Sequence, residues 1–162
     1  MGKIVSIVLA AGESRRMGSP KMLLELKGST IIENVISHVA DSLSEGTIVV
    51  LGAYSDEIES VVKKYAVQVC YNDNFSDGML SSVQCGIRNL PDETAAVLVF
   101  QGDQPFISSE TIDKVINAYR LSDKGIVLPV YQGKRGHPLL LDAKYMNEVG
   151  KLDELVDNHI PV

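Results

Sequence analysis

The residues with the clearest chemical potential lie in one short loop, LAAGESRRMGSPK, residues 9–21. An apolar run ends there at Gly12, and three cations, Arg15, Arg16 and Lys21, follow closely. A glycine-rich turn can present backbone N–H groups to an anion and lets a phosphate approach closely, while nearby cations offset its charge. The loop therefore predicts a site for a small ligand that carries phosphate.

The spacing in this loop excludes two common phosphate-binding motifs. The dinucleotide fingerprint needs G-x-G-x-x-G, but Gly12 is followed by Glu13 and Ser14. The P-loop needs four residues between its glycines and then Lys-Ser/Thr, whereas five residues separate Gly12 from Gly18. Each cation taken singly is most simply a surface residue, so the prediction depends on the whole string.

A second stretch, VLVFQGDQP at 97–105, places an acid at the end of another apolar run. The run passes through Gly102 into Asp103. Magnesium prefers carboxylate and phosphate oxygens and keeps several waters, so one or two acids are enough to hold it. Capping of a turn is the alternative role for an aspartate just before a proline-containing turn. Asp103 is therefore a candidate magnesium ligand.

Alternating strands and helices must hold these loops in place. Continuous apolar runs, typical of strands buried on both faces, predict strands at 4–11, 47–51, 67–71, 95–100 and 126–130. Apolar residues spaced three or four apart predict helices over 31–43, 55–65, 80–90 and 108–119. Ser55 or Asp56 is expected to cap the second of these helices, and Ser108 or Ser109 the fourth.

This alternation predicts a three-layer, Rossmann-like α/β fold, in which helices cover both faces of a mostly parallel sheet. Right-handed crossovers place the carboxyl ends of parallel strands along one edge, and ligands of such sheets bind there. The stretch 131–141 instead contains a Gln132-Gly133 turn before an apolar run, which indicates a hairpin-like return. We expect the turn at Gly12 and the Asp103 carboxylate to share one cleft at this edge.

The composition limits the possible partners. The 162 residues suffice for one domain with a full core, and the net charge of −6 argues against nonspecific nucleic-acid binding. No apolar run approaches the ~18 residues of a membrane span, and the N-terminus lacks a signal-peptide layout. We therefore expect a cytoplasmic protein with no nucleic-acid or membrane partner. Cys70 and Cys85 are expected to be reduced thiols, because their spacing suits neither zinc nor a disulfide framework.

The opening loop closely resembles the signature of the molybdenum-cofactor-type nucleotidyltransferases, written L-A-[AG]-G-x-S-x-R-M-G-x-x-K. Every fixed position matches, namely Leu9, Ala10, Ala11, Gly12, Ser14, Arg16, Met17, Gly18 and Lys21. The resemblance implies a fold of the nucleotide-diphospho-sugar transferase type and a loop that wraps a nucleoside triphosphate. It implies that Arg16 and Lys21 are catalytic cations on the phosphates, and that Asp103, in a [GA]-D-x-P loop, binds the catalytic Mg²⁺.

Other loops at the same edge extend the resemblance to the nucleotide base. Leu51 and Gly52 match a base-facing Leu-Gly pair. A Gly-Met/Leu-x-x-Ser element near the base and the triphosphate is matched by Gly78, Met79, Ser81 and Ser82. For Ser82, capping of the following helix is an equally good explanation. In members of the family that look like this chain, alanine at the position of Ala11 goes with CTP and glycine with GTP.

The string Arg135, Gly136, His137, Pro138 resembles an element of the cytidylyltransferase branch that lines the pterin-substrate side. Without that context, His137 would be interpreted as a structural histidine on a turn. Together with Ala11, the string implies Mg²⁺-dependent transfer of CMP from CTP to the phosphate of molybdopterin or the molybdenum cofactor. Pyrophosphate would be released.

The end of the sequence departs from the family and leaves other functions open. VGKLDELVDNH stands where members carry a Gly-Asp-x-Gly-Ala-Arg turn, and members continue beyond the position of Val162. We expect a single nucleotidyltransferase domain, residues 1–162, without the family's C-terminal strand and helix. One alternative is a non-catalytic nucleotide-binding protein that helps to mature a molybdenum hydroxylase. The other is a cytidylyltransferase acting on a small phosphorylated polyol or sugar.

Overall fold

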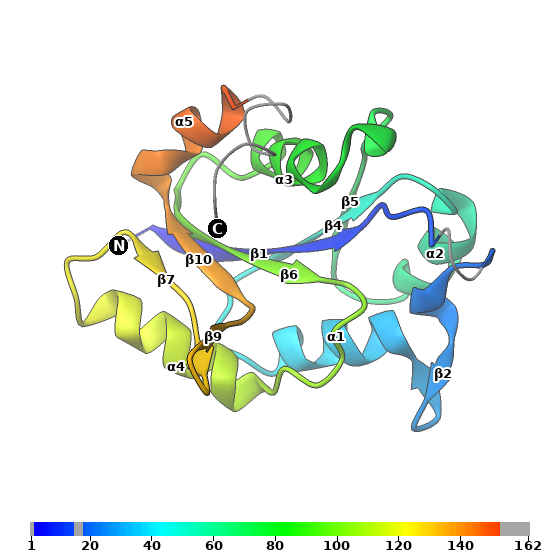
Figure 1. Ribbon diagram of the computed structural model, residues 1–162, viewed down its shortest axis with the longest axis horizontal. Helices are drawn as coiled ribbons and strands as arrows, with labels where there is room; N and C mark the ends of the chain where they lie inside the picture. The colour runs from blue at the N-terminus through cyan, green and yellow to red at the C-terminus, as the bar shows by residue number, and fades with distance from the viewer. Residues whose placement is uncertain (1, 15–17, 153–162) are drawn as a thin grey trace.

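A six-stranded sheet forms the centre of the computed structural model, which describes residues 2–14 and 18–152 (Figure 1). The order across the sheet is β5-β4-β1-β6-β10-β7. In that order the strands span Gln68–Tyr71, Thr47–Leu51, Lys3–Ala10, Thr94–Gln101, Leu139–Asp142 and Ile126–Val127. The first four run parallel to one another, and β10 is antiparallel to both β6 and β7. The mostly parallel sheet is thus confirmed.

Helices cover both faces of this sheet (Figure 1). One face carries α1 (Ile31–Ala40), α2 (Ser55–Val62) and α4 (Ser109–Arg120), and the other carries α3 (Met79–Arg88) and α5 (Met146–Gly150). The central strand β1 contributes side chains to the apolar core on each face of the sheet, because alternate side chains of a strand point to opposite faces. Its Ile4 and Val8 pack toward α1, and its Val5 and Ile7 pack toward α3. The predicted three-layer arrangement is confirmed.

The direction of β10 decides which loops reach the edge where β1 and β6 end. Leu139 pairs with Val99 near the carboxyl end of β6, so the residues just before Leu139 lie at that same edge. A parallel strand would have brought its last residues there instead. The hairpin-like return predicted for this stretch is therefore confirmed, and we call the edge the carboxyl rim.

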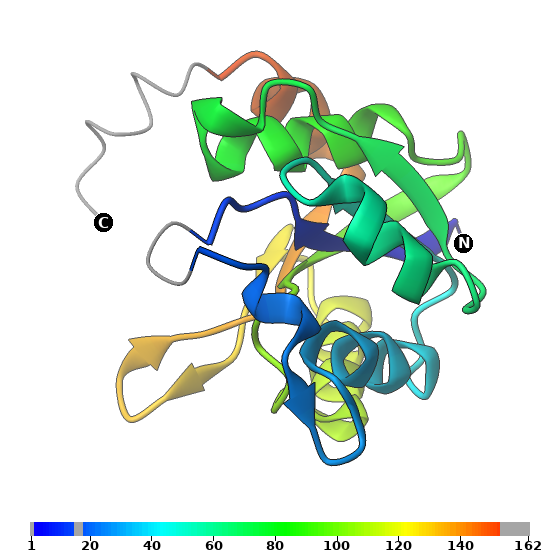
Figure 2. The same cartoon turned by 90° about the vertical axis from the view of Figure 1, so that its right-hand side faces the viewer.

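The strand predicted at 126–130 is broken in two. Ile126–Val127 joins the sheet as β7, whereas β8 (Val130–Tyr131) pairs with β9 (Lys134–Arg135) in a separate projecting arm (Figure 2). Pro129 lies between the two segments, and it has no N–H group to donate to a strand ladder. Its carbonyl oxygen instead accepts a hydrogen bond of 2.9 Å from the Gly136 N–H, which closes the base of the arm.

One predicted helix cap is wrong and one is confirmed. The N-cap of α2 is Tyr54, in a left-handed conformation with φ of 57°, and no side chain caps that helix, so neither Ser55 nor Asp56 has the role expected of it. The chain enters α2 through a tight turn that places both residues already inside the first helical turn, where Asp56 still interacts favourably with the helix dipole. Ser108 caps α4 as predicted, because its hydroxyl accepts from the Thr111 N–H.

The two cysteines lie between the sheet and α3. Both are free and buried, and their sulfur atoms are 3.5 Å apart. Burial, together with the neighbouring Cys85, raises the pKa of the Cys70 thiol to about 12. The reduced state expected from the sequence is the state in the structure. Over the described residues, no helix is both long enough and apolar enough to cross a bilayer.

Candidate active site

The loop that follows β1 is folded back on itself around Ser14. The Gly18 N–H donates to the Ser14 carbonyl oxygen at 3.1 Å, and the Lys21 N–H donates to the Ser14 hydroxyl at 3.2 Å. Ser14 and Gly18 both have positive φ, 50° and 65°, which glycine adopts at no steric cost. These contacts explain why a serine and a glycine stand at those positions. Arg16 lies outside the described residues.

Lys21 and Asp103 meet across the carboxyl rim. The Lys21 Nζ atom is 3.7 Å from the Asp103 Oδ2 atom, and both side chains are partly exposed, at 49% and 36%. Lys21 opens the short 3₁₀ helix η1 (Lys21–Leu23), whereas Asp103 follows β6, so two loops far apart in the sequence converge here. The expectation that the first loop and the Asp103 carboxylate share one cleft is confirmed.

Gly102 fixes the position of Asp103. Its N–H donates to the Leu9 carbonyl oxygen at 2.9 Å, which ties the end of β6 to the end of β1. A Cβ atom at this position would lie 2.8 Å from that same oxygen and 2.8 Å from the Met22 sulfur. Only glycine allows this close approach, so the residue before Asp103 is constrained by packing against β1 and η1.

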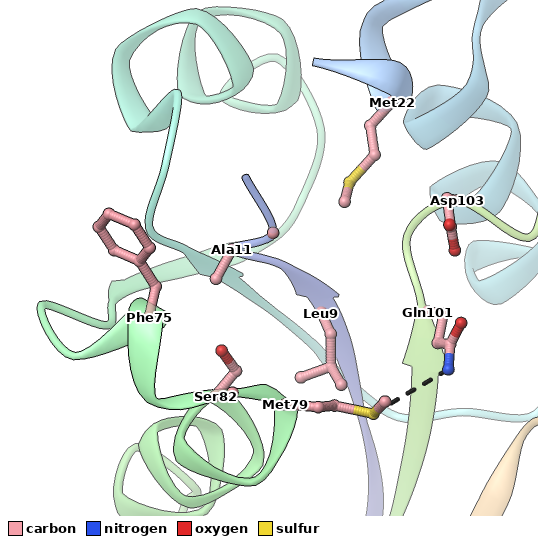
Figure 3. Close-up of a pocket in the computed structure, with 10 residues that line it drawn as sticks. Leu9, Ala11, Met22, Phe75, Met79, Ser82, Gln101 and Asp103 are labelled. Atoms are coloured by element: carbon pink, nitrogen blue, oxygen red, sulfur yellow. Dashed lines mark hydrogen bonds between the residues drawn. The ribbon is translucent and has the colours of Figure 1, made fainter. Parts of the chain in front are cut away.

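A cleft of about 260 Å³ opens beside Asp103, between β1, β6 and the start of α3 (Figure 3). We call it the rim cleft. Six residues predicted for the site line it, namely Leu9, Ala11, Gly12, Gly78, Ser82 and Asp103. Met79, which matches the expected Gly-Met-x-x-Ser element, also lines it, and so do three residues that the sequence did not indicate, namely Met22, Phe75 and Gln101.

Phe75, Met79 and Gln101 complete the walls of the rim cleft. Phe75 lies beside Ala11, and Met79 extends under Leu9 toward Gln101 (Figure 3). The Gln101 amide nitrogen is 4.0 Å from the Met79 sulfur. Gln101 could have been found from the sequence, because it is the last residue of a strand and comes just before the Gly102-Asp103 pair. Nothing in the local pattern distinguishes Phe75.

Some predicted nucleotide-binding residues lie behind the walls instead. Ala10 and Leu51 are fully buried in the core on the α1 face, so their side chains are not available to a ligand. Gly52 packs directly behind the wall, since a Cβ atom there would lie 2.8 Å from the Ala11 Cβ and 2.7 Å from the Phe75 Cβ. Gly52 therefore permits the close packing of Ala11 and Phe75.

Ser82 does not cap α3. The N-cap of that helix is Gly78, with no side-chain cap, and the nearly buried Ser82 hydroxyl accepts a hydrogen bond of 3.0 Å from the Asn72 amide. Asn72 also donates to the Ser81 hydroxyl at 2.9 Å. The buried amide thus ties the loop after β5 to the first turn of α3, and the open start of the helix faces the rim cleft.

The Arg135–Pro138 segment spans the junction between the arm and β10. Arg135 and Gly136 are exposed, His137 is half-buried, and Pro138 is buried. Burial lowers the pKa of the His137 imidazole below its usual value, and the negative charge of Asp103 opposes this shift. His137 stands two residues before Leu139, which pairs with Val99 near the carboxyl end of β6, so the segment lies at the same rim.

Asp103 suits a magnesium ion that arrives with its own ligands. Among the described residues, no group of three or more histidine, cysteine, aspartate or glutamate side chains could hold a metal by itself. Magnesium commonly uses one or two carboxylates and takes its other ligands from phosphate oxygens and water. One carboxylate at the rim fits this chemistry.

Comparison with known proteins identifies the chain. Residues 6–159 match the MobA-like NTP transferase domain. The chain belongs to this family. Its members are nucleotidyltransferases, so the enzyme class expected from the opening loop is confirmed.

Two known proteins are each 30% identical to this chain. One is the molybdenum cofactor cytidylyltransferase of Escherichia coli, aligned over 87% of this chain and 71% of its own length. The other is a probable molybdenum cofactor guanylyltransferase of Natranaerobius thermophilus, aligned over 80% of this chain and 62% of its own length. The match thus spans about two thirds of these relatives.

Solved structures share the fold. Rv0371c from Mycobacterium tuberculosis superposes with a TM-score of 0.85 at 22% identity, covering 93% of this chain and 77% of that one. The same protein has also been crystallised in complex with manganese. The 4-diphosphocytidyl-2C-methyl-D-erythritol synthase of Anaerococcus prevotii superposes with a TM-score of 0.74 at 21% identity, covering 99% of this chain and 78% of that one. A CMP:2-keto-3-deoxy-manno-octonic acid synthetase superposes with a TM-score of 0.73 at 14% identity, covering 96% of this chain and 83% of that one. The predicted nucleotide-diphospho-sugar transferase fold is confirmed.

Proposed function

We propose that the protein transfers CMP from CTP to the phosphate of molybdopterin or the molybdenum cofactor and releases pyrophosphate. The observation that carries the proposal is the convergence of Lys21 and Asp103, whose charged atoms lie 3.7 Å apart, together with the rim cleft that Asp103 lines. A metal–triphosphate complex requires a carboxylate to bind the metal and, close to it, a cation to neutralise the phosphates.

The nucleotide fits this arrangement with its base in the rim cleft and its phosphates on the first loop. Ala11 and Phe75 would form one wall of the base site, and Gly78 and Ser82 the floor. The triphosphate would lie along the loop from Gly12 to Lys21, together with Arg16. Such chemistry depends on positioning and charge neutralisation more than on covalent catalysis.

The reaction replaces one phosphoanhydride bond by another. An oxygen of the acceptor phosphate forms a bond to the α-phosphorus of CTP, and the bond from that phosphorus to the bridging oxygen breaks. The electron pair leaves with pyrophosphate, and Lys21 stabilises the charge that collects there. A divalent ion on Asp103, Mg²⁺ in our proposal, would supply further neutralisation when bound, and the manganese complex of Rv0371c supports a divalent ion in this fold.

The acceptor phosphate is assigned to the Arg135–Pro138 segment. The position of the segment supports this assignment, because it comes just before Leu139, which pairs with Val99 near the carboxyl end of β6. For the base, Ala11 supports CTP, and so does the similarity to the Escherichia coli cytidylyltransferase. The equally similar relative from Natranaerobius is a probable guanylyltransferase, so overall identity alone does not separate CTP from GTP. A molybdenum hydroxylase that receives the product would be the downstream partner.

A transfer assay tests the proposal. The protein is incubated with Mg²⁺ and α-labelled CTP or GTP, and with either molybdopterin or ribitol 5-phosphate as the acceptor. We expect a labelled dinucleotide product only with CTP and molybdopterin. Product with ribitol 5-phosphate instead would identify a polyol cytidylyltransferase. CTP binding without any transfer would favour the accessory role.

Two variants test the residues at the centre of the site. Asp103→Asn should abolish metal-dependent transfer, because the variant loses the carboxylate proposed to hold the metal. Lys21→Ala should raise the Kd for CTP–Mg²⁺ at least tenfold, because the variant loses a positive charge beside the triphosphate. Lys114→Ala is the matched control, since Lys114 is an exposed α4 residue whose ammonium group pairs with Glu110 at 3.1 Å. Unchanged transfer by Asp103→Asn, or unchanged CTP binding by Lys21→Ala, would refute the site.

A further inference from the structure

Met79 presents a thioether sulfur to the rim cleft. It is the first residue of α3, it lines the cleft, and 54% of its surface is accessible. The other methionines among the described residues are better protected, since Met22 is buried and Met146 is half-buried. Oxidants in solution reach an exposed sulfur before a buried one. Of these three side chains, Met79 is therefore the one that a peroxide attacks first.

The two cysteines compete poorly for the same oxidant. Both are buried between the sheet and α3, and burial raises the pKa of the Cys70 thiol to about 12. A cysteine reacts as its thiolate, which such burial suppresses at neutral pH. A thioether has no proton to lose, so its sulfur lone pair is available at any pH. An oxidant that enters the rim cleft therefore meets Met79 as its reactive sulfur.

Gln101 faces the Met79 sulfur across one end of the cleft with a weakly used donor. The Gln101 side-chain oxygen accepts from the Gln104 amide at 3.3 Å, which leaves its amide nitrogen facing the Met79 sulfur at 4.0 Å (Figure 3). A thioether is only a weak acceptor. The backbones on both sides are held in place, because Gln101 pairs with Leu9 in the sheet and the start of α3 is tied to Asn72.

We propose that Met79 is a reversible oxidation site, and that its sulfoxide oxygen accepts a hydrogen bond from the Gln101 amide and closes that end of the rim cleft. Hydrogen peroxide would transfer one oxygen atom to the sulfur. The O–O bond breaks, a sulfur lone pair forms the S–O bond, and a proton shift releases the second oxygen as water. The sulfur loses two electrons and the peroxide gains them. Methionine sulfoxide reductases, with a thiol reductant, restore the thioether.

Oxidation would change the cleft in two ways. The sulfoxide is polar and replaces an apolar part of the wall, and its oxygen offers the Gln101 amide a full hydrogen bond in place of the contact with sulfur. The resulting bridge from α3 to β6 would narrow the cleft beside Leu9. In our proposal the nucleotide occupies this cleft, so CTP would be excluded. This last step alone rests on the proposed function.

Peroxide treatment followed by peptide mass mapping tests the oxidation site. We expect sulfoxide at Met79 before Met22 or Met146, and a rise of about tenfold in the Kd for CTP–Mg²⁺, as for a competing hydrogen bond. Reduction by the two sulfoxide reductases, one for each epimer, should restore the Kd. Met79→Leu removes the sulfur at nearly constant volume, and Met146→Leu on α5 is the matched control.

Each variant is compared with itself before and after peroxide. The rise in Kd should persist in Met146→Leu and disappear in Met79→Leu. A rise that persists in Met79→Leu, as it would if Met17 outside the described residues were the target, would overturn the inference. So would a Met79 that stays unoxidised while Met22 and Met146 react.

The side-chain amide resonance of Gln101, identified by its absence in Gln101→Leu, tests the bridge without any nucleotide. We expect its N–H protons to shift downfield on oxidation of the wild type and to stay in place in Met79→Leu. Gln101→Leu should also lose less CTP affinity on oxidation than the wild type. An unchanged resonance in protein that carries Met79 sulfoxide would refute the bridge. If the wild type binds no CTP, the proposed function fails, whereas a shifted resonance still establishes the oxidation-dependent bridge.

Discussion

Glu33 gives the fold a defined sensitivity to acid. It lies in the first turn of α1, and its carboxylate accepts hydrogen bonds from the Tyr65 hydroxyl at 2.5 Å and the Thr30 N–H at 3.1 Å, with the Lys64 Nζ at 2.9 Å. These partners, the Tyr65 bond first, lower the pKa of Glu33 from 4.5 to about 2 although burial opposes the shift. The network ties the helix that carries Ile31 to the end of α2.

The sign and size of the effect follow from the shift. Because the folded state holds the Glu33 proton less tightly than the unfolded chain, this stabilisation is complete above the unfolded pKa of 4.5. It is lost as the pH falls through the folded pKa of about 2. A shift of this size corresponds to about 3 kcal/mol at pH 7, of which about 2 kcal/mol is lost by pH 3.

Urea unfolding of wild type and Glu33→Gln at pH 7, 5 and 3 measures this contribution. We expect the variant to be less stable at pH 7 and the difference to shrink by about 2 kcal/mol between pH 7 and pH 3. The exposed Glu110→Gln variant on α4 serves as the control and should show a small, nearly constant difference. A Glu33→Gln difference that stays the same from pH 7 to pH 3 would show that this carboxylate is not selectively stabilised in the folded state.

Two further predictions concern packing at the sheet. Gly102→Ala should lower the free energy of unfolding by about 1–3 kcal/mol, measured by thermal unfolding, and should weaken CTP–Mg²⁺ binding in calorimetry. The reason is that the added methyl group meets the Leu9 carbonyl oxygen and the Met22 sulfur. Unchanged stability and binding would mean that the end of β6 can shift to make room for the methyl group. Native Cys70 should resist iodoacetamide at pH 8 and react only in urea, because its thiol is buried with a pKa of about 12; rapid native labelling would contradict this.

The sequence predicts the parts of the site that depend on local pattern and on general sheet geometry. The buried strand before Gly12 and the one before Asp103 are each clear from their apolar runs. Because parallel strands have their carboxyl ends at the same edge of a sheet, the loops after these two strands are predicted to meet. The 3.7 Å contact between Lys21 and Asp103 confirms this prediction.

Features that depend on the approach of distant segments were not predictable in this way. Phe75 lines the rim cleft where Gly52 allows it to pack beside Ala11. These three residues are far apart in the sequence, and only the folded sheet brings them together. The left-handed conformation of Tyr54 and the strand break at Pro129 are local features. At each of them the local sequence pattern is equally compatible with the simpler prediction, a side-chain helix cap in the first case and an unbroken strand in the second.

The ion pair between Lys21 and Asp103 also bears on how the site is loaded. A divalent cation that binds the Asp103 carboxylate would have to displace the Lys21 ammonium group, which lies 3.7 Å from it. A nucleotide that carries the metal brings phosphates that can accept the evicted ammonium group at the same moment. In our proposal, Lys21 therefore serves as the counterion of Asp103 until a nucleotide that carries its metal replaces it.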